Sequence, residues 1–192
     1  MQRIDGKTLG EYLEEAPVIA AVKSEEGLAR SLECESRVVF VLYGDLVTIP
    51  AITARIRKAG KTAFVHIDLV DGLASREVAA DFIAQTTSAD GIISTKPGII
   101  RHAHTAGLLT VQRFFLLDSI ALQNARKQLE GDAADFIEVL PGVMPKIIRR
   151  LAADTQKPLI AGGLINDKED VLSALSAGAA AVSSTNPDVW FL

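Results

Sequence analysis

Eight short apolar runs, each followed by a stretch with helical spacing, constrain the fold of this 192-residue chain more than any other feature. The runs are rich in β-branched residues and almost continuously apolar, which is typical of strands buried on both faces of a parallel sheet. The stretches between them have the pattern of amphipathic helices. We predict strands at residues 17–22, 38–43, 62–68, 91–96, 109–116, 136–141, 158–163 and 180–185.

Eight strand–helix units predict an α/β fold, a compact TIM-like (β/α)8 barrel. The alternative is a doubly wound open sheet, but such sheets normally contain about five or six strands. Few residues follow Thr185, so we expect a truncated last helix, and we predict that a helix at residues 9–15 covers the part of the barrel left open. We find no linker and therefore predict one domain over residues 1–192, with residues 1–16 as an N-terminal helical extension.

Several residues mark where helices should begin. Ser75 is expected to cap the helix that follows it. Asn166 and Glu169 have the spacing of a capping box. Pro50 and Pro97 suit the first turn of a helix, where the missing N–H costs little.

Composition excludes several classes of protein. The net charge of −4 and the pI near 5.4 exclude nucleic-acid binding by bulk positive charge, which usually requires a pI above about 9. Aromatic residues make up 5% of the chain, which argues against a base-stacking surface. The single cysteine, Cys34, cannot form an internal disulfide. The N-terminus lacks the apolar core of a signal peptide, and no run approaches the roughly 18 apolar residues of a membrane span, so we expect a cytoplasmic protein without a membrane partner.

The ends of the last two predicted strands carry the sharpest functional signal. Barrels bind ligands at the C-terminal ends of their strands and often hold a phosphate between the loops after strands seven and eight. Gly162 and Gly163 end the seventh strand, and Ser183, Ser184 and Thr185 end the eighth. Backbone N–H groups near glycines and side-chain hydroxyls suit an anion, and a one-turn helix after Asn186 would point at the same place. The alternative is that the glycines only turn the chain and the serines only cap it.

Other strand ends carry polar residues with more than one interpretation. Lys96 is a countercharge for phosphate or carboxylate, a Schiff-base nucleophile, or a lysine extending from the barrel mouth. His66 and Asp68 share one face of a strand and suit hydroxyl binding better than metal binding, because no further ligand has a telling spacing. Glu138 is expected to point into the barrel and to meet Lys96, Arg113 or a ligand hydroxyl, or to form a purely structural ion pair.

Two basic clusters lie on predicted outer helices, and clusters of this kind are usually solvated and only sometimes bind phosphate groups. They comprise Arg55, Arg57 and Lys58 in the first, and Lys146, Arg149 and Arg150 in the second. The chain contains no dinucleotide, Walker or zinc-protease motif, so we expect neither a cofactor nor a metal.

The strand-end motifs resemble those of the glycerol uptake operon antiterminator regulatory proteins, the glycerol-3-phosphate-responsive antiterminators. The likeness spans nearly the whole chain in order, through PVIAAV, FVHIDLVDGL, DGIISTK, QRFFLLDS, EVLPGVMPKII, PLIAGGLI and AGAAAVSSTNPDVW. The resemblance implies a barrel without catalytic activity that binds glycerol 3-phosphate and then the leader mRNA of glycerol-utilisation genes, so that transcription passes a terminator. The implied ligand-binding residues are His66, Asp68, Lys96, Glu138, Gly162, Gly163, Ser183, Ser184 and Thr185.

Chemistry assigns roles within that set. Gly163, Ser184 and Thr185 would donate to the phosphate with Lys96 as countercharge, and the ligand hydroxyls would donate to Asp68 or Glu138. No motif defines an RNA contact, so the two basic clusters are the candidates. A phosphosugar enzyme, aldolase-like or isomerase-like, is the alternative because it would use the same phosphate site. The sequence leaves formation of a homo-oligomer open.

Overall fold

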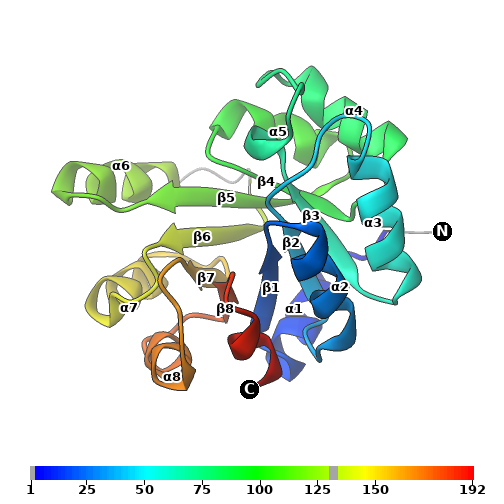
Figure 1. Ribbon diagram of the computed structural model, residues 1–192. Coiled ribbons are helices and arrows are strands. Elements are labelled where there is room, and N and C mark those ends of the chain that lie inside the picture. Colours follow the sequence, from blue (N-terminus) through cyan, green and yellow to red (C-terminus); the bar gives the residue numbers. More distant parts are fainter. Residues whose placement is uncertain (1–2, 130–133) are drawn as a thin grey trace.

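The computed structural model describes residues 3–129 and 134–192, so residues 1–2 of the predicted N-terminal extension lie outside it. Eight parallel strands close into a barrel in chain order, with β1 paired to β8 (Figure 1). The strands are β1 (Val18–Val22), β2 (Val38–Val41), β3 (Thr62–His66), β4 (Gly91–Ser94), β5 (Leu109–Phe115), β6 (Phe136–Leu140), β7 (Leu159–Gly162) and β8 (Ala181–Ser184). The predicted (β/α)8 architecture is confirmed, and each strand is one or two residues shorter than its predicted run.

Helices cover the outside of the barrel (Figure 1). They are α1 (Gly6–Glu15), α2 (Glu25–Glu33), α3 (Ile49–Lys58), α4 (Val78–Thr86), α5 (Pro97–Thr105), α6 (Ser119–Leu129), α7 (Pro145–Asp154) and α8 (Lys168–Ser176), with 3-10 helices η1 (Ile67–Leu69) and η2 (Pro187–Phe191). Among these helices, none has the combination of length and hydropathy required to cross a bilayer.

The predicted helix starts are partly right. Pro50 and Pro97 both lie in the first turn of a helix, as expected. The Ser75 prediction is wrong, because α4 begins after Glu77 and no side chain caps it. The predicted capping box of Asn166 and Glu169 does not form: Asp167 is the N-cap of α8 and accepts from the amide of Asp170, and the Asp170 side chain accepts from the amide of Asn166.

Apolar side chains fill the barrel interior. Alternate residues of a strand point to opposite faces, and the inward ones form one buried cluster with large members such as Ile19, Phe40, Phe64 and Ile93. The Phe40 and Phe64 rings pack with their centroids 5.7 Å apart. This packed interior leaves ligand binding to the C-terminal end of the barrel, where the inward side chains become polar.

The N-terminal helix forms as predicted but covers a different part of the barrel. Leu9 and Leu13 of α1 belong to the interior cluster, so α1 closes the N-terminal end of the barrel. The last helix is truncated to η2, as expected, and η2 itself contacts β1, β8 and α2. Its buried Val189 and Trp190 fill the gap that α1 was predicted to cover, because η2 follows β8 directly and needs no long connection.

Candidate functional site

A pocket of about 100 Å³ opens at the C-terminal ends of β6, β7 and β8. An engineered cavity of about 150 Å³ holds benzene, so a pocket of this size suits a compact ligand. Its lining comprises Ala21, Leu42, Arg113, Glu138, Leu140, Gly163, Leu164, Ile165, Asn166, Ser183, Ser184 and Thr185. The structure therefore brings five of the nine predicted ligand-binding residues to one pocket: Glu138, Gly163, Ser183, Ser184 and Thr185.

A buried carboxylate forms the floor of this pocket. Glu138 of β6 is completely buried and points inward, as expected. Its Oε2 accepts a hydrogen bond from Nε of Arg113 at 2.5 Å, and its Oε1 accepts one from Oγ of Ser183 at 2.6 Å. Residues from β5, β6 and β8 thus form one hydrogen-bonded network inside the barrel. Arg113, rather than Lys96, is the ionic partner of Glu138.

Arg113 also directs unused hydrogen-bond donors at the pocket. A guanidinium has five N–H donors in a planar fork that matches phosphate and carboxylate oxygens. Only Nε of Arg113 is engaged; its two terminal nitrogens have no acceptor in residues 3–129 and 134–192. Because Arg113 is 6% exposed, its free N–H groups lie in a poorly solvated environment, where hydrogen bonds to an anion are stronger than in water, although the carboxylate of Glu138 offsets the charge of the guanidinium.

The loop after β7 supplies backbone donors beside Arg113. The amides of Gly163, Leu164 and Ile165 have no acceptor among the described residues. Gly163 has φ 74° and Leu164 has φ 62°, and the left-handed conformation is unusual for leucine. The carbonyl of Gly163 accepts from the amide of Gly142 at 2.9 Å, which ties this loop to the one after β6. Consecutive free amides in such a turn form an anion-binding concavity.

The hydroxyl residues of β8 divide into two roles. Oγ of Ser184 donates to the carbonyl of Ile165 at 2.7 Å and accepts from the amide of Asn186 at 3.0 Å, so its only proton is used to hold two loops together. Thr185 lines the pocket with an exposed side chain whose hydroxyl has no partner among the described residues. The predicted helix after Asn186 exists as η2, but the Asn186 side chain caps it by accepting from the amide of Asp188. The hydroxyl of Thr185 is therefore free to donate a hydrogen bond to a ligand. The hydroxyl of Ser184 already donates to Ile165, and the start of η2 is already capped by Asn186.

Gly162 lies next to the pocket without lining it. A Cβ added there would lie 2.5 Å from Oγ of Ser183 and 2.6 Å from Oε1 of Glu138. Only a residue without a side chain leaves room for this hydrogen-bonded pair.

A second polar cluster occupies the ends of β3 and β4. Asp68 accepts from Oγ of Ser94 and from the amide of Thr95, each at 2.9 Å. Burial raises the pKa of Asp68, but these hydrogen bonds outweigh it and hold the pKa below its usual value. Nζ of Lys96 lies 3.9 Å from Oδ1 of Asp68 and also donates to Ser75. Neither Asp68 nor Lys96 lines the pocket between β6 and β8, whereas Arg113 does.

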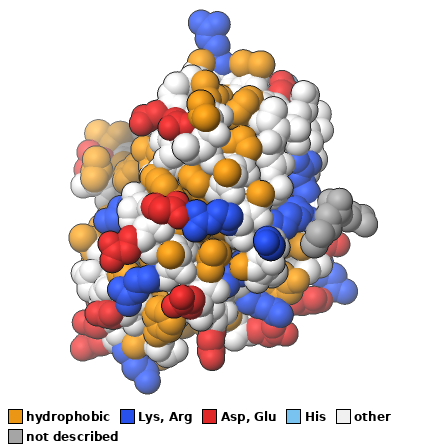
Figure 2. All heavy atoms as spheres, turned by 45° about the vertical axis from the view of Figure 1, so that its right-hand side comes forward, with side chains coloured by type: hydrophobic (Ala, Val, Ile, Leu, Met, Phe, Trp, Pro, Cys, Tyr) orange, Lys and Arg blue, Asp and Glu red, His pale blue; other side chains and the backbone are white. Residues whose placement is uncertain are grey.

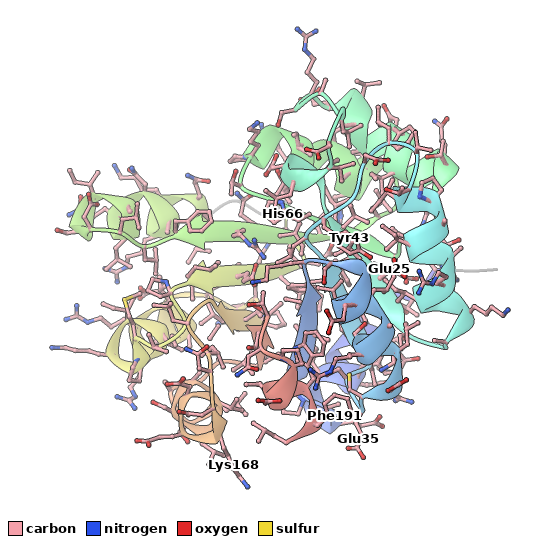
Figure 3. All side chains as sticks on the ribbon, viewed as in Figure 1. Glu25, Glu35, Tyr43, His66, Lys168 and Phe191 are labelled. Carbon is pink, nitrogen blue, oxygen red and sulfur yellow. The ribbon has the colours of Figure 1, made fainter. Side chains whose placement is uncertain are left out.

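His66 is the last residue of β3 and has the same inward parity as Phe64. It lies at the same end of the barrel as Tyr43, which follows β2 (Figure 3). It is 3% exposed, and its Nδ1 has no hydrogen-bond partner in the part of the chain that the structure describes. Burial, followed by the nearby charge of Arg113, lowers the pKa of His66 to about 4. His66 is therefore a neutral imidazole at neutral pH. It does not line the pocket, but it lies close enough to Arg113, which does, for that charge to lower its pKa.

The two predicted RNA-binding clusters lie on different sides of the barrel, on α3 and α7 (Figure 1). Arg55 pairs with Glu25, and Arg57 pairs with Asp90 at 3.2 Å. On the face that carries α3, basic and acidic side chains are interspersed (Figure 2). The cations of α3 are therefore largely neutralised, whereas Lys146, Arg149 and Arg150 of α7 are exposed.

Sequence reasoning predicted the amide of Gly163 as a donor but missed Arg113 and the amides of Leu164 and Ile165 as groups at the pocket. A usable signal existed for Arg113: it has the same parity in its strand as the inward residues Leu109 and Val111. The free amides had no such signal beyond the glycine pair.

Comparisons with known proteins show the family of the chain and agree with its barrel fold. Residues 18–190 match the family described as glycerol-3-phosphate responsive antiterminator. The uncharacterized protein YgcP of Escherichia coli (strain K12) is 43% identical over 180 residues, which cover 94% of each chain. The structure of a glycerol uptake operon antiterminator regulatory protein from Listeria monocytogenes superposes with a TM-score of 0.86 at 31% identity, covering 90% of this chain and 94% of that one. An antiterminator-related protein from Thermotoga maritima gives a TM-score of 0.78 at 32% identity, covering 90% and 96%.

Proposed function

The chain belongs to the glycerol-3-phosphate-responsive antiterminator family, and we propose that it is a metabolite-sensing regulator of glycerol-utilisation genes. In this proposal it binds glycerol 3-phosphate in the pocket between β6 and β8. The liganded protein then binds the leader of the target mRNA in the cytoplasm and lets transcription pass a terminator.

The pocket chemistry carries the ligand assignment. Terminal N–H groups of Arg113, the free amides of residues 163–165 and the hydroxyl of Thr185 converge on one small pocket. A phosphate dianion has oxygens enough to accept from all of them, and charge-assisted hydrogen bonds of this kind are the strong ones. A pocket of about 100 Å³ limits the remainder of the ligand to a few carbon atoms.

The floor of the pocket suits the glycerol end. Each Glu138 oxygen accepts one hydrogen bond from the protein and retains a further lone pair. Glycerol 3-phosphate has two hydroxyls that can donate to these lone pairs, whereas dihydroxyacetone phosphate has one hydroxyl and a ketone oxygen that cannot donate. The site therefore favours glycerol 3-phosphate over dihydroxyacetone phosphate.

The alternative of an aldolase-like enzyme has less support. A Schiff-base mechanism needs a desolvated lysine at the reacting carbon. Among the described residues no lysine lines this pocket, and Lys96 is half exposed beside Asp68. Distant aldolase barrels share the fold at 14–16% identity, which carries no argument about activity.

Calorimetry tests the proposal directly. Glycerol 3-phosphate should bind, glycerol and dihydroxyacetone phosphate should bind at least about tenfold more weakly, and no turnover of either phosphate should occur. Leader RNA should tighten glycerol 3-phosphate binding by the same factor by which glycerol 3-phosphate tightens RNA binding, because coupling is reciprocal. Equal affinity for glycerol and glycerol 3-phosphate would overturn the phosphate site, and RNA binding that ignores the ligand would overturn the sensor.

A further inference from the structure

Strand β5 separates the ligand pocket from a groove on the outside of the barrel. Arg113 points inward to the pocket, while its neighbours Gln112 and Phe114 line the outer groove, as alternation along a strand requires. The groove has a volume of about 230 Å³ and runs between α5 and α6, which both lie along the outer side of β5 (Figure 1).

The groove is cationic. Arg101 of α5, Lys127 of α6 and Lys157 line it, and its described lining contains no aspartate or glutamate. Arg101 and Lys127 are exposed, and their side chains have no partner in residues 3–129 and 134–192. Their charges are therefore available to an external anion.

Helix α7 continues this charge beyond α6. Arg126 of α6 binds Asp154 of α7 with Nε–Oδ2 at 2.7 Å, which identifies the side of α7 that faces α6. Arg150 and Lys146 lie four and eight residues before Asp154, so they occupy the same side of the helix. Two exposed cations therefore extend along the α6-facing side of α7.

The net charge of this part of the chain is positive, whereas the net charge of the remainder is negative. Residues 97–163 contain eight Lys and Arg against six Asp and Glu, a net charge of +2. The remaining residues contain twelve against eighteen, a net charge of −6. Local positive charge of this kind binds a polyanion even when the whole protein is acidic.

We propose that Arg101, Lys127, Lys146 and Arg150, here termed the α5–α7 flank, bind the sugar-phosphate backbone of RNA. The identity of the partner rests on the proposed function, and the placement of the surface rests on the groove and its charges. Long, separated cations suit phosphate contacts, which position an RNA without reading its bases.

The same geometry couples RNA to the ligand. A phosphate bound to Arg113 restrains β5 at that residue. Its two neighbours in the strand, Gln112 and Phe114, form the wall of the outer groove. Nε2 of Gln112 donates to the carbonyl of Thr95 at 3.1 Å, which links the groove wall to the start of α5. Ligand binding therefore favours one arrangement of the surface that RNA contacts.

Fluorescence anisotropy tests the α5–α7 flank. The probe is a labelled leader transcript of the host's glycerol-utilisation operon, and glycerol 3-phosphate is kept at a saturating concentration. The double variant Lys127→Glu/Arg150→Glu should weaken RNA binding by about 25-fold or more, at about fivefold for each charge removed. The slope of log K against log salt should fall by about two. The control Lys58→Glu on α3, also an exposed cation, should bind RNA like the wild type. Glycerol 3-phosphate affinity without RNA should be unchanged in all three proteins.

The outcomes separate the surface from the function. If the wild type binds the transcript and the flank variant binds it equally well, the surface is refuted and the proposed function stands. If Lys58→Glu weakens binding as much as the flank variant, the contact is diffuse and the proposed surface is again refuted. If the wild type binds glycerol 3-phosphate but binds scrambled RNA as tightly as leader RNA, the leader is not its specific partner and the proposed function is overturned, whereas the comparison with the flank variant still decides the surface.

Discussion

Nε of Arg113 lies 2.5 Å from Oε2 of Glu138, and both side chains are buried inside the barrel above its apolar core. A buried ion pair contributes little net stability, but removal of one partner leaves an uncompensated charge and costs about 3–5 kcal/mol. The same guanidinium faces the ligand pocket with its remaining donors. The pair therefore links the stability of the barrel to the chemistry of the site.

Glu138→Leu should lower the free energy of unfolding by about 3–5 kcal/mol, because it strands the charge of Arg113. The double variant Arg113→Met/Glu138→Leu should recover most of that loss, since it replaces the pair with apolar side chains of similar volume. Urea denaturation measures both values. Calorimetry should show that the stable double variant no longer binds glycerol 3-phosphate. Retained affinity in that variant would refute Arg113 as the phosphate partner.

His66 should make the stability of the protein depend on pH. The folded protein holds the pKa of His66 at about 4, below its ordinary value of 6.5. As the pH falls from 6.5 to 4, the unfolded chain binds a proton that the folded chain does not, so stability is lost over that window, on the order of 3 kcal/mol. In His66→Gln this part of the decline should vanish.

Unfolding titrations of the wild type and His66→Gln at several pH values measure this effect as a difference between the two proteins. The difference isolates His66 from Asp68, whose lowered pKa contributes stability that is also lost as the pH falls, but at still lower pH. Above pH 7 the difference should be constant. Parallel curves down to pH 4 would show that His66 is not desolvated.

The fold was predictable because burial on both faces of a strand leaves a continuous apolar run, and eight such runs permit few topologies. The identity of the pocket cation was not predicted, because Lys96 and Arg113 both interrupt apolar sequence near a strand end. Arg113 lies within β5 and inherits the inward direction of Leu109 and Val111. Lys96 follows the last residue of β4, so strand alternation no longer fixes its direction.

The role of each hydroxyl also required tertiary information. Ser184 and Thr185 look equivalent in sequence, but Ser184 is buried and its proton goes to Ile165, nineteen residues earlier in the chain. No local pattern specifies such a partner. The N-cap of α8 was mispredicted for a simpler reason: Asp167 follows Asn166 directly, and both residue types are good N-caps.

Trp190 should report ligand binding by its fluorescence. It is the only tryptophan of the chain, it is buried, and its Nε1 donates to the carbonyl of Ser184 at 2.8 Å. A phosphate bound to Thr185 changes the electric field one residue away from that carbonyl. Titration with glycerol 3-phosphate should therefore change the emission of Trp190 with a midpoint equal to the calorimetric Kd, whereas glycerol should leave it unchanged. An unchanged spectrum at saturation would place the ligand elsewhere.

Gly162→Ala should damage the site through sterics alone. The added methyl group would lie 2.5 Å from Oγ of Ser183 and 2.6 Å from Oε1 of Glu138, too close for either atom to remain in place. Overpacking of a buried network costs about 1–3 kcal/mol, and displacement of Glu138 should abolish glycerol 3-phosphate binding.

Gly10→Ala is the matched control, because Gly10 lies within α1 and a Cβ there meets nothing within 4 Å. Alanine is a better helix former than glycine, so this control should raise stability by up to about 1 kcal/mol and leave ligand binding intact. Calorimetry and urea denaturation of both variants measure the two effects. If Gly162→Ala binds glycerol 3-phosphate with wild-type affinity, the hydrogen bond between Ser183 and Glu138 is not part of the ligand site.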